Sequence, residues 1–475
     1  MTRDKISFVL DGQQKKVAFT ELAPTTTVLN YLRSLPGHKG VKEGCAEGDC
    51  GACTVVMAEK GADGKLSYKG YNSCLVFLPM VEGKQLITVE EVGKSDSLHP
   101  IQKAMVETDG SQCGYCTPGF IMSMLALYKN SHKPSRAEID DALTGNLCRC
   151  TGYRPIIEAA AQACVNHGKD HFAETEPLVI KLLDSIERDD IDIQTPEQQY
   201  FRPASLGKAL ELRTSHPDAL LITGATDIAL RVTKSHEVLE KIIDLSGIES
   251  LKKIEVTEEG ITFGAGASLE AVRQQSKEKL PALYDCLSVF GSVMIRNLAS
   301  LGGNLGTSSP IGDTPPILMA YDATVILTGP NGNREVPVRE FITGYRAHVT
   351  AKNEIIHSIQ VPFPGTDTHI KWYKVSKRKD LDISTVSAGF RLNKDSSGRA
   401  GEIHLYYGGM AAQTQRASKA ESFLEGKPWS RSAIEGAMDI LAEDFFPISD
   451  ARASAEGRRV IARNLLLKFW VETSF

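Results

Sequence analysis

The chain has 475 residues and a formal net charge of −5, with 42% hydrophobic and 24% charged residues. This length predicts two to four domains, and the composition is that of a globular protein with a sizeable core. The absence of a long basic block in the sequence argues against binding to nucleic acid or to an anionic membrane surface. The N-terminus predicts a strand rather than a signal peptide, and no stretch is apolar enough to span a bilayer, so we expect a cytoplasmic protein.

Residues 1–90 predict a small, mostly β domain. Strands are expected at 5–12 and 15–22, followed by a short helix at 26–35 that Pro36 and Gly37 end. A loop rich in glycine and cysteine, 44–53, leads into a further strand at 54–59.

Residues 91–167 predict four helices and no strand, arranged as two helix–loop–helix pairs. Thr117 and Pro118 are typical of an N-cap and a first helical position, and Ser135 with Glu138 is typical of a capping box. Each loop between paired helices carries two cysteines, namely Cys113 and Cys116 in the first and Cys148 and Cys150 in the second. This pseudo-repeat predicts one site built from both halves.

The remainder of the chain predicts mixed α and β structure. Residues 168–197 are polar and acidic and predict a linker with one short helix, and residues 198–370 predict strands at 219–224 and 261–266. The last segment, 371–475, predicts a separate domain. Its expected strands precede its expected helices, at about 370–376 and 401–410, then 431–445 and 458–473. The predicted fold class is therefore a multidomain α+β protein.

Eight of the ten cysteines lie between Cys45 and Cys150. In a cytoplasmic chain such a concentration indicates metal ligands rather than disulfides. The run EGCAEGDCGACT has the C-x4-C-x2-C spacing that plant-type ferredoxins use for a 2Fe–2S cluster. Its expected ligands are Cys45, Cys50, Cys53 and, twenty-one positions after Cys53, Cys74. A structural zinc site or unligated cysteines are disfavoured alternatives, because zinc knuckles use paired C-x2-C units.

The second group of cysteines is less diagnostic by itself. QCGYCTPG gives C-x2-C and NLCRCTGY gives C-x-C, and this spacing leaves zinc, iron–sulfur or no metal open. The neighbouring ferredoxin-like segment favours a second electron carrier over a zinc staple. Cys164 and Cys286 fit neither pattern, and we expect both to be ordinary buried cysteines.

Two glycine-containing segments in the second half are candidates for binding a pyrophosphate. Gly224-Ala225-Thr226-Asp227 follows an apolar strand and predicts a tight turn with backbone N–H groups free to face an anion. The segment 302–304, between Ser300 and Thr307, predicts a second such turn. Either one alone is usually only a turn, and neither is a Rossmann fingerprint.

These motifs together resemble the molybdenum hydroxylases, the xanthine dehydrogenase and aldehyde oxidase group. EGCAEGDCGACT, QCGYCTPG and NLCRCTGYRPI resemble the iron–sulfur half of that family, whereas LLITGATDI (220–228) and RNLASLGGNLGTSSPIGDTPP (296–316) resemble its flavin domain. The resemblance implies two 2Fe–2S clusters and FAD. The domains it implies are a β-grasp ferredoxin-like domain (1–90), a four-helix iron–sulfur domain (91–167), an FAD-binding domain (198–370) and a small α+β C-terminal flavoprotein domain (371–475), with a linker at 168–197.

The resemblance also implies roles for individual flavin-site residues. The FAD pyrophosphate would be wrapped by Leu221, Ile222, Thr223, Gly224, Ala225, Thr226, Asp227 and Ile228, and contacted by Ser300, Asn304 and Thr307. Asp313 would hydrogen-bond the adenosine part, with Phe290 beside the adenine and Ile356 near the same end. Lys374 would bond the flavin, and Tyr345 would lie against the isoalloxazine where nicotinamide docks. Without the family, Tyr345 is equally well a core tyrosine.

Iron–sulfur and flavin domains on one chain, without a molybdenum domain, are similar to the small subunits of bacterial members of this family. The resemblance implies a large molybdopterin-binding partner in a heterotetramer, a dimer of heterodimers, with Gln112 bonded to the pterin. Electrons would pass from molybdenum to the Cys113 cluster, the Cys45 cluster, FAD and finally NAD. No catalytic acid or base on this chain is needed.

One departure from the family bears on the final electron acceptor. Leu381 separates Asp380 from Asp382, where the family often has consecutive acids, so NAD follows less directly from the resemblance than FAD. Two other functions stay open from the sequence: a self-contained iron–sulfur flavoprotein reductase or diaphorase, and a zinc-stapled binding module. Iron, sulfide and flavin measured per chain separate them.

Overall fold

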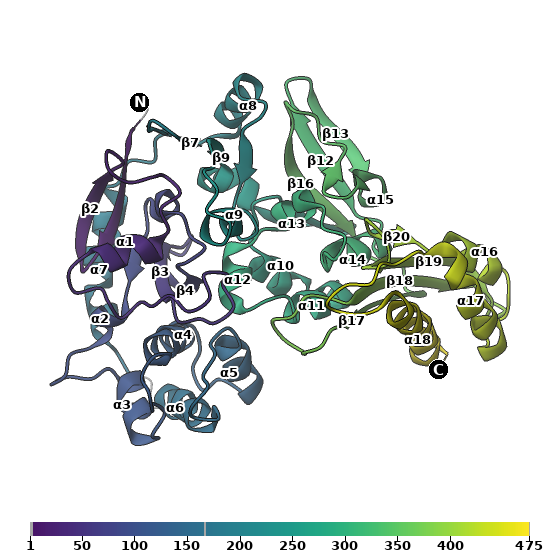
Figure 1. Ribbon diagram of the computed structural model, residues 1–475, viewed down its shortest axis with the longest axis horizontal. Helices are drawn as coiled ribbons and strands as arrows, with labels where there is room; N and C mark the ends of the chain where they lie inside the picture. Colours follow the sequence, from purple (N-terminus) through teal and green to yellow (C-terminus); the bar gives the residue numbers. More distant parts are fainter. Residues whose placement is uncertain (1–2, 166–167, 475) are drawn as a thin grey trace. The chain divides into compact units, whose positions relative to one another are not determined.

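The computed structural model describes residues 3–165 and 168–474 of the chain (Figure 1). The chain divides into two compact units. The first comprises Met1–Leu212, Asp218–Ile248 and Gly291–Ala299, and the second comprises Arg213–Pro217, Glu249–Phe290 and Ser300–Phe475. The predicted flavin segment therefore contributes residues to both units.

The first unit contains a five-stranded sheet in the order β2-β1-β5-β3-β4. Its strands are β1 (Lys5–Leu10), β2 (Gln13–Ala18), β3 (Thr54–Lys60), β4 (Leu66–Asn72) and β5 (Gln85–Ile87). β1 pairs parallel with β5, and the other neighbours pair antiparallel. The expected strands at 5–12, 15–22 and 54–59 are confirmed as β1, β2 and β3. The sequence did not predict β4, which contains lysine and glycine, or β5, which has only three residues.

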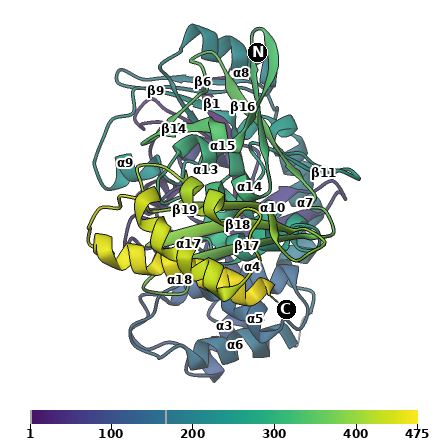
Figure 2. The same cartoon turned by 90° about the vertical axis from the view of Figure 1, so that its right-hand side faces the viewer.

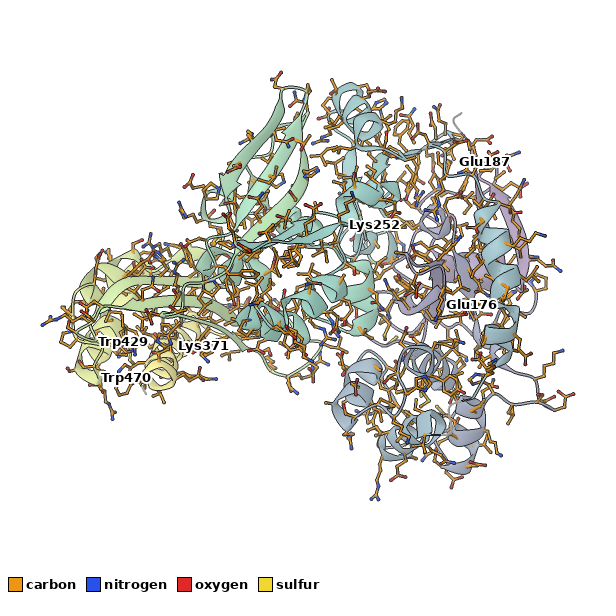
Figure 3. All side chains as sticks on the ribbon, turned by 180° about the vertical axis from the view of Figure 1, so that it is seen from behind. Glu176, Glu187, Lys252, Lys371, Trp429 and Trp470 are labelled. Carbon is orange, nitrogen blue, oxygen red and sulfur yellow. The ribbon has the colours of Figure 1, made fainter. Side chains whose placement is uncertain are left out.

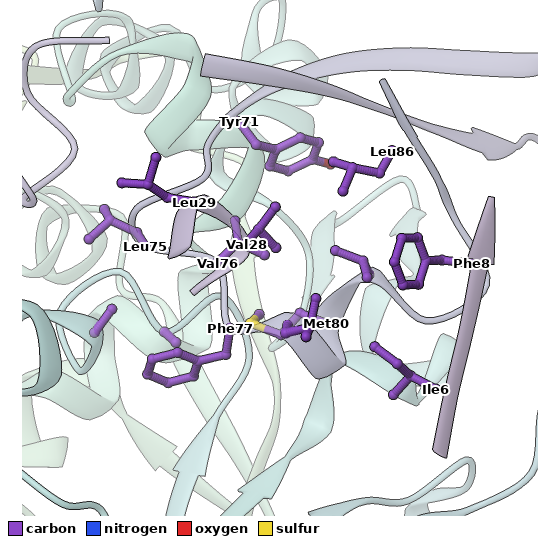
Figure 4. Close-up of a cluster of buried hydrophobic side chains, with 14 of the residues drawn as sticks. Ile6, Phe8, Val28, Leu29, Tyr71, Leu75, Val76, Phe77, Met80 and Leu86 are labelled. Atoms are coloured by element: carbon purple, nitrogen blue, oxygen red, sulfur yellow. The ribbon is translucent and has the colours of Figure 1, made fainter. Parts of the chain in front are cut away.

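Helix α1 (Val28–Ser34) confirms the expected helix at 26–35 and buries Val28, Leu29 and Leu32. The Thr27 side chain caps it by accepting a hydrogen bond from the backbone N–H of Asn30. Figure 4 shows Val28 and Leu29 in one apolar cluster with side chains from the sheet and from the segment after Cys74. This core holds both ends of the cysteine-rich loop 44–53, which runs from α1 to β3.

The four helices expected between 91 and 167 are confirmed as α3 (Pro100–Glu107), α4 (Thr117–Asn130), α5 (Arg136–Leu143) and α6 (Arg154–Val165); a short helix, α2 (Val89–Val92), precedes them. The capping box of Ser135 and Glu138 is also confirmed. The expected N-cap at Thr117 is wrong, because the N-cap of α4 is Cys116. The Thr117 hydroxyl instead lies 2.7 Å from that of Ser111.

The expected linker contains a well-packed helix, α7 (His171–Asp184), which buries Phe172, Val179 and Leu183 in the same core as α4 and α6. Asp170 caps this helix and accepts hydrogen bonds from Lys129 Nζ at 2.9 Å and His99 Nε2 at 3.2 Å. Glu176, labelled in Figure 3, accepts a hydrogen bond from the backbone N–H of Leu66 at 3.3 Å. This helix is therefore an integral part of the first unit.

A second sheet of the first unit has the order β6-β7-β9-β8. Its strands are β6 (Ile191–Gln194), β7 (Gln199–Arg202), β8 (Leu220–Ile222) and β9 (Lys241–Asp244). Residues of α9 (Ala229–Thr233) and α12 (Val293–Leu298) pack in the same core as this sheet, and α8 (Leu206–Ser215) follows β7 in the chain. Arg296 of α12 is fully buried and pairs with Asp141 of α5 at 2.7 Å, so α12 is joined to the helical segment 91–167.

The second unit has a five-stranded sheet in the order β10-β11-β16-β12-β13 and a hairpin. These strands are β10 (Ile254–Val256), β11 (Gly260–Gly264), β12 (Thr324–Gly329), β13 (Gly332–Pro337), β16 (Ile355–Pro362), and the hairpin strands β14 (Ile342–Gly344) and β15 (Ala347–His348). The helices of this region are α10 (Leu269–Ser276), α11 (Pro281–Ser288), α13 (Leu301–Thr307), α14 (Thr314–Ala320) and α15 (Val338–Phe341). The strand expected at 261–266 is confirmed as β11.

The C-terminal part of the second unit is a sheet, β17-β18-β19-β20, with three helices (Figure 2). The strands are β17 (Thr368–Val375), β18 (Val386–Lys394), β19 (Ala400–Gly408) and β20 (Gln415–Arg416), and the helices are α16 (Ser418–Leu424), α17 (Arg431–Asp444) and α18 (Ala455–Thr473). The two strands and two helices expected here are confirmed as β17, β19, α17 and α18. The indole of Trp470 donates to the Trp429 carbonyl at 3.3 Å, which ties α18 to the segment before α17 (Figure 3). Among the residues that the structure describes, no helix combines the length and apolar character needed to cross a membrane.

The buried Glu421 of α16 makes the second unit sensitive to pH. Its carboxylate accepts a hydrogen bond from the Leu405 N–H at 2.6 Å and pairs with Arg416. Burial nevertheless raises the pKa of Glu421 to about 7. Between the unfolded and folded pKa values the folded state binds more protons. The stability that this one group contributes is therefore fully present below its unfolded pKa and is lost as the pH rises through about 7.

We expect the stability of the wild type relative to Glu421→Gln to fall by up to about 3 kcal/mol between pH 4.5 and 7.5. The glutamine variant cannot titrate, so the difference isolates this one carboxyl group. Glu435→Gln, at an exposed position on α17, is the matched control and should show no such trend. Denaturant unfolding across this pH range measures the difference, and a flat difference for Glu421→Gln would contradict the assignment.

Candidate iron–sulfur and flavin sites

The first four predicted thiols lie together in the first unit. Cys53 and Cys74 are each 2% exposed, and their sulfur atoms are 3.4 Å apart. The thiol of Cys45 contacts those of Cys50 and Cys74, and these contacts lower the pKa of Cys45. The loop 44–53 and the residues after β4 thus deliver all four sulfur atoms to one place.

The donor set of this site suits a two-iron cluster. Within residues 3–165 and 168–474, no group of three or more His, Cys, Asp or Glu side chains can hold a single metal ion. A 2Fe–2S cluster does not need such a group, because its four thiolates are shared two by two between the irons. The sulfur contacts include such pairs, with Cys45 beside Cys50 and Cys53 beside Cys74.

The second set of thiols comes from the loops that precede α4 and α6. Cys113 contacts Cys150, and Cys116 contacts Cys148, so the two halves of the pseudo-repeat meet. Cys113 and Cys150 are exposed, whereas Cys148 is buried. Burial, followed by the contact with Cys148, raises the pKa of Cys116 to about 12. The backbone N–H of Cys148 donates to the Tyr153 hydroxyl at 3.0 Å, which fixes the second loop.

A backbone hydrogen bond joins the two loops that carry the thiol sets. The backbone N–H of Leu147, next to Cys148, donates to the carbonyl oxygen of Cys50 at 3.0 Å. Beside it, the buried Asn146 amide donates to the Gly51 carbonyl at 3.2 Å and accepts from the Ser123 hydroxyl at 2.6 Å. The sequence did not single out Asn146 or Leu147, although they immediately precede the C-x-C pair.

Glycines make this close approach of the two loops possible. Gly51 has φ +68°, and a Cβ there would lie 2.3 Å from the Gly145 carbonyl oxygen. A Cβ at Gly119, in the first turn of α4, would lie 2.2 Å from the Gly51 carbonyl oxygen. Only residues without a side chain fit at both positions.

The first predicted flavin segment, 221–228, lies in the first unit and comprises the last two residues of β8 and the turn that leads to α9. It forms the expected tight turn, with Ala225 in the left-handed region at φ +56°. The backbone of Gly224 lies so close to the last residue of α12 that a Cβ at this position would be 1.7 Å from the Leu298 carbonyl oxygen. The structure therefore packs the LITGATDI turn against the residues that immediately precede Ser300.

The other predicted flavin residues belong to the second unit: Phe290, Ser300, Asn304, Thr307, Asp313, Tyr345, Ile356 and Lys374. The turn expected at 302–304 is wrong, because these residues form the start of α13. Ser300 caps this helix by accepting from the Gly303 N–H at 3.0 Å, which continues the backbone as a helix. Asn304 accepts a hydrogen bond from Thr314.

Asp313 and Lys374, expected to contact different parts of FAD, are paired with each other. Lys374 Nζ lies 2.9 Å from Asp313 Oδ2, and the two side chains are 6% and 8% exposed. Ser384 donates to the other carboxylate oxygen of Asp313. The sequence gave no signal for Ser384, which lies at the end of the charged loop that contains Leu381.

The remaining flavin candidates differ in exposure. Tyr345 is 67% exposed at the turn of the β14–β15 hairpin, so its interpretation as a core tyrosine is wrong. Ile356 lies on β16 and Phe290 follows α11, and both side chains are half-buried. The expected burial of Cys164 and Cys286 is confirmed, since both thiols are almost completely enclosed.

Four family models match the chain. They describe a 2Fe-2S iron-sulfur cluster binding domain at residues 10–78, a [2Fe-2S] binding domain at 88–161, an FAD binding domain in molybdopterin dehydrogenase at 194–364, and a CO dehydrogenase flavoprotein C-terminal domain at 371–473. The chain carries the 2Fe–2S and FAD domains of the molybdenum hydroxylase family. The first thiol set falls within the match at 10–78, and the second falls within the match at 88–161.

Two curated proteins that match almost the whole chain are much longer than it is. Xanthine dehydrogenase of Emericella nidulans is 34% identical over 93% of this chain and 36% of its own length. Xanthine dehydrogenase/oxidase of Gallus gallus is 32% identical over 99% of this chain and 40% of its own length. The chain therefore spans less than half the length of these relatives. A solved carbon monoxide dehydrogenase chain from Hydrogenophaga pseudoflava superposes with a TM-score of 0.54 and 25% identity, over 58% of this chain and 96% of that chain.

Proposed function

We propose that this chain is the electron-transfer subunit of a xanthine dehydrogenase-type molybdenum hydroxylase. It would take electrons from a molybdopterin-binding partner subunit at the Cys113 site, pass them by the Cys45 site to FAD, and deliver them to NAD. When bound, the clusters carry single electrons and FAD combines two of them into a hydride. The residues of the chain hold these groups, set their separation and control their access to solvent.

The observation that carries the proposal is the order of sites within the first unit. The second thiol set is exposed at Cys113 and Cys150, whereas the first set is buried at Cys53 and Cys74. The Leu147–Cys50 hydrogen bond links these two sets. Lys234, six residues after the flavin turn, donates to the carbonyl oxygen of Cys45 at 3.1 Å. This order supports a route from a surface site, through a buried site, toward the flavin.

Exposed aromatic and aliphatic side chains around the second thiol set support a partner at that surface. Tyr115, Leu147 and Tyr153 are all exposed there, as is Gln112. Large apolar groups that gather on a surface are typical of protein interfaces. We propose that this surface faces the molybdopterin-binding subunit, with Gln112 toward the pterin, in a cytoplasmic heterotetramer that is a dimer of heterodimers.

The proposal of NAD as the acceptor is supported by the second unit. Tyr345 presents an exposed ring, which suits stacking of a planar nicotinamide. The charged loop after Lys374 is held by its own contacts, since Asp382 accepts from the Arg378 N–H at 2.9 Å and Leu381 adopts φ +52°. This loop and Tyr345 are the elements that we propose to select the acceptor.

Purification of the full chain from its native host tests the proposal. We expect a larger molybdenum-containing subunit to copurify, with about four iron atoms and one FAD per chain. The complex should reduce NAD with xanthine, and the separated chain should not. If no partner copurifies and the chain alone shows full NADH-linked reductase turnover, the result would favour a self-contained reductase or diaphorase. Zinc without flavin would favour the binding module.

A further inference from the structure

Two residues that follow the flavin turn hold three consecutive residues of the first cysteine loop. Thr233, the last residue of α9, donates its hydroxyl hydrogen to the Ala46 carbonyl oxygen at 2.7 Å. Lys234 Nζ donates to the Cys45 carbonyl oxygen at 3.1 Å and lies 3.2 Å from Glu47 Oε2. All five residues belong to the first unit. Their separation of about 190 positions explains why no sequence pattern indicated the contact.

The loop segment that these bonds hold is strained. Ala46 adopts φ +57°, a left-handed conformation that is unfavourable for a residue with a side chain. This conformation turns the next peptide so that the Glu47 N–H points at the sulfur of Cys45, at 3.4 Å. The hydrogen bond from Thr233 to the Ala46 carbonyl oxygen stabilises the turn that makes this N–H···S contact possible.

We propose that Thr233 is a positioning residue that sets the reduction potential of the first 2Fe–2S cluster. Hydrogen bonds to the sulfur ligands tune the potential of such clusters. An N–H dipole directed at Cys45 stabilises the additional negative charge of the reduced cluster. Loss of the Thr233 bond lets Ala46 relax, moves the Glu47 N–H off the sulfur and makes the potential more negative.

Lys234 acts on the same cluster through charge. Its ammonium group lies beside the Cys45 carbonyl and also neutralises the Glu47 carboxylate, so it reduces the negative potential around the loop. Thr233 and Lys234 together connect the loop of the first cluster to the segment that directly follows the flavin turn. The two residues thereby match the potential of the cluster to its place before the flavin.

Thr233→Val in the cofactor-loaded full chain tests the proposal, because valine keeps the shape of threonine and lacks the donor. We expect iron and FAD content to be retained. In an EPR-monitored redox titration, the ratio of reduced to oxidised first cluster at a fixed potential should fall about three- to tenfold. The second cluster, whose thiols Thr233 does not contact, should titrate as in the wild type. Thr233→Ser keeps the hydroxyl and should also titrate as the wild type does.

A second substitution separates positioning from general damage. Glycine adopts the left-handed region without cost, so Ala46→Gly added to Thr233→Val should restore the wild-type potential of the first cluster, even if Thr233→Val alone loses iron. The proposal is overturned if Thr233→Val leaves the first potential unchanged or shifts both clusters equally. It is also overturned if the double variant stays at the shifted potential.

Discussion

Replacement of Cys53 by alanine is expected to remove the first 2Fe–2S cluster and to halve the iron content of the chain, from about four to about two atoms. Cys53 is 2% exposed and lies 3.4 Å from the sulfur of Cys74. Loss of one of the two thiolates on an iron leaves that iron incompletely ligated inside a buried site. The second set draws its ligands from other loops, so its cluster should remain, and transfer of electrons to FAD should stop at the vacant first site.

The matched controls are two buried cysteines outside both sets. Cys164→Ala and Cys286→Ala remove thiols that are as deeply enclosed as Cys53, and we expect both variants to keep about four iron atoms. Iron, acid-labile sulfide and EPR spectra of the reduced protein measure the outcome. Full iron in Cys53→Ala, or equal loss of iron in Cys164→Ala, would contradict the ligand assignment.

Local chemistry explains what the sequence predicted. The C-x4-C-x2-C run places three thiols on one loop, and each later pair lies on a loop that opens a helix, so short-range spacing is enough to recognise them. The capping box at Ser135 is equally local, since both of its hydrogen bonds span three residues. The strands β1 and β3 follow from runs of β-branched and apolar residues. The more polar β2 follows from the turn after β1, which returns the chain beside that strand.

Contacts between distant segments explain what the sequence did not predict. Asn146 meets Gly51 across 95 positions, and Thr233 meets Ala46 across 187 positions. The glycines at 302 and 303 suggested a turn, but the cap provided by Ser300 directs the chain into α13. The polar segment after residue 168 predicted a linker with one short helix, and three apolar residues of the helix found there, α7, are buried in the core. In each case the local structure depends on contacts or packing that the spacing of residues along the sequence does not reveal.

The buried pair of Lys374 and Asp313 leads to the largest expected effect in the second unit. Lys374→Met leaves the Asp313 carboxylate enclosed, with the Ser384 hydroxyl as its remaining side-chain donor among the described contacts. An uncompensated buried charge costs about 3–5 kcal/mol. We therefore expect Lys374→Met to lower the free energy of unfolding by about this amount and to lower the FAD content, since both residues are proposed to contact FAD.

A double variant distinguishes this ion pair from a simple loss of packing. Asp313→Asn combined with Lys374→Met removes both charges, and we expect it to be more stable than Lys374→Met alone. Lys371→Met, at an exposed position on the same strand, is the matched control and should change stability by less than about 0.5 kcal/mol. Denaturant unfolding and bound-flavin absorbance measure both effects. If Lys374→Met unfolds like Lys371→Met, the pair does not stabilise the fold. If Lys374→Met unfolds at a lower denaturant concentration than the wild type but retains FAD, the pair stabilises the sheet and does not contribute to FAD binding.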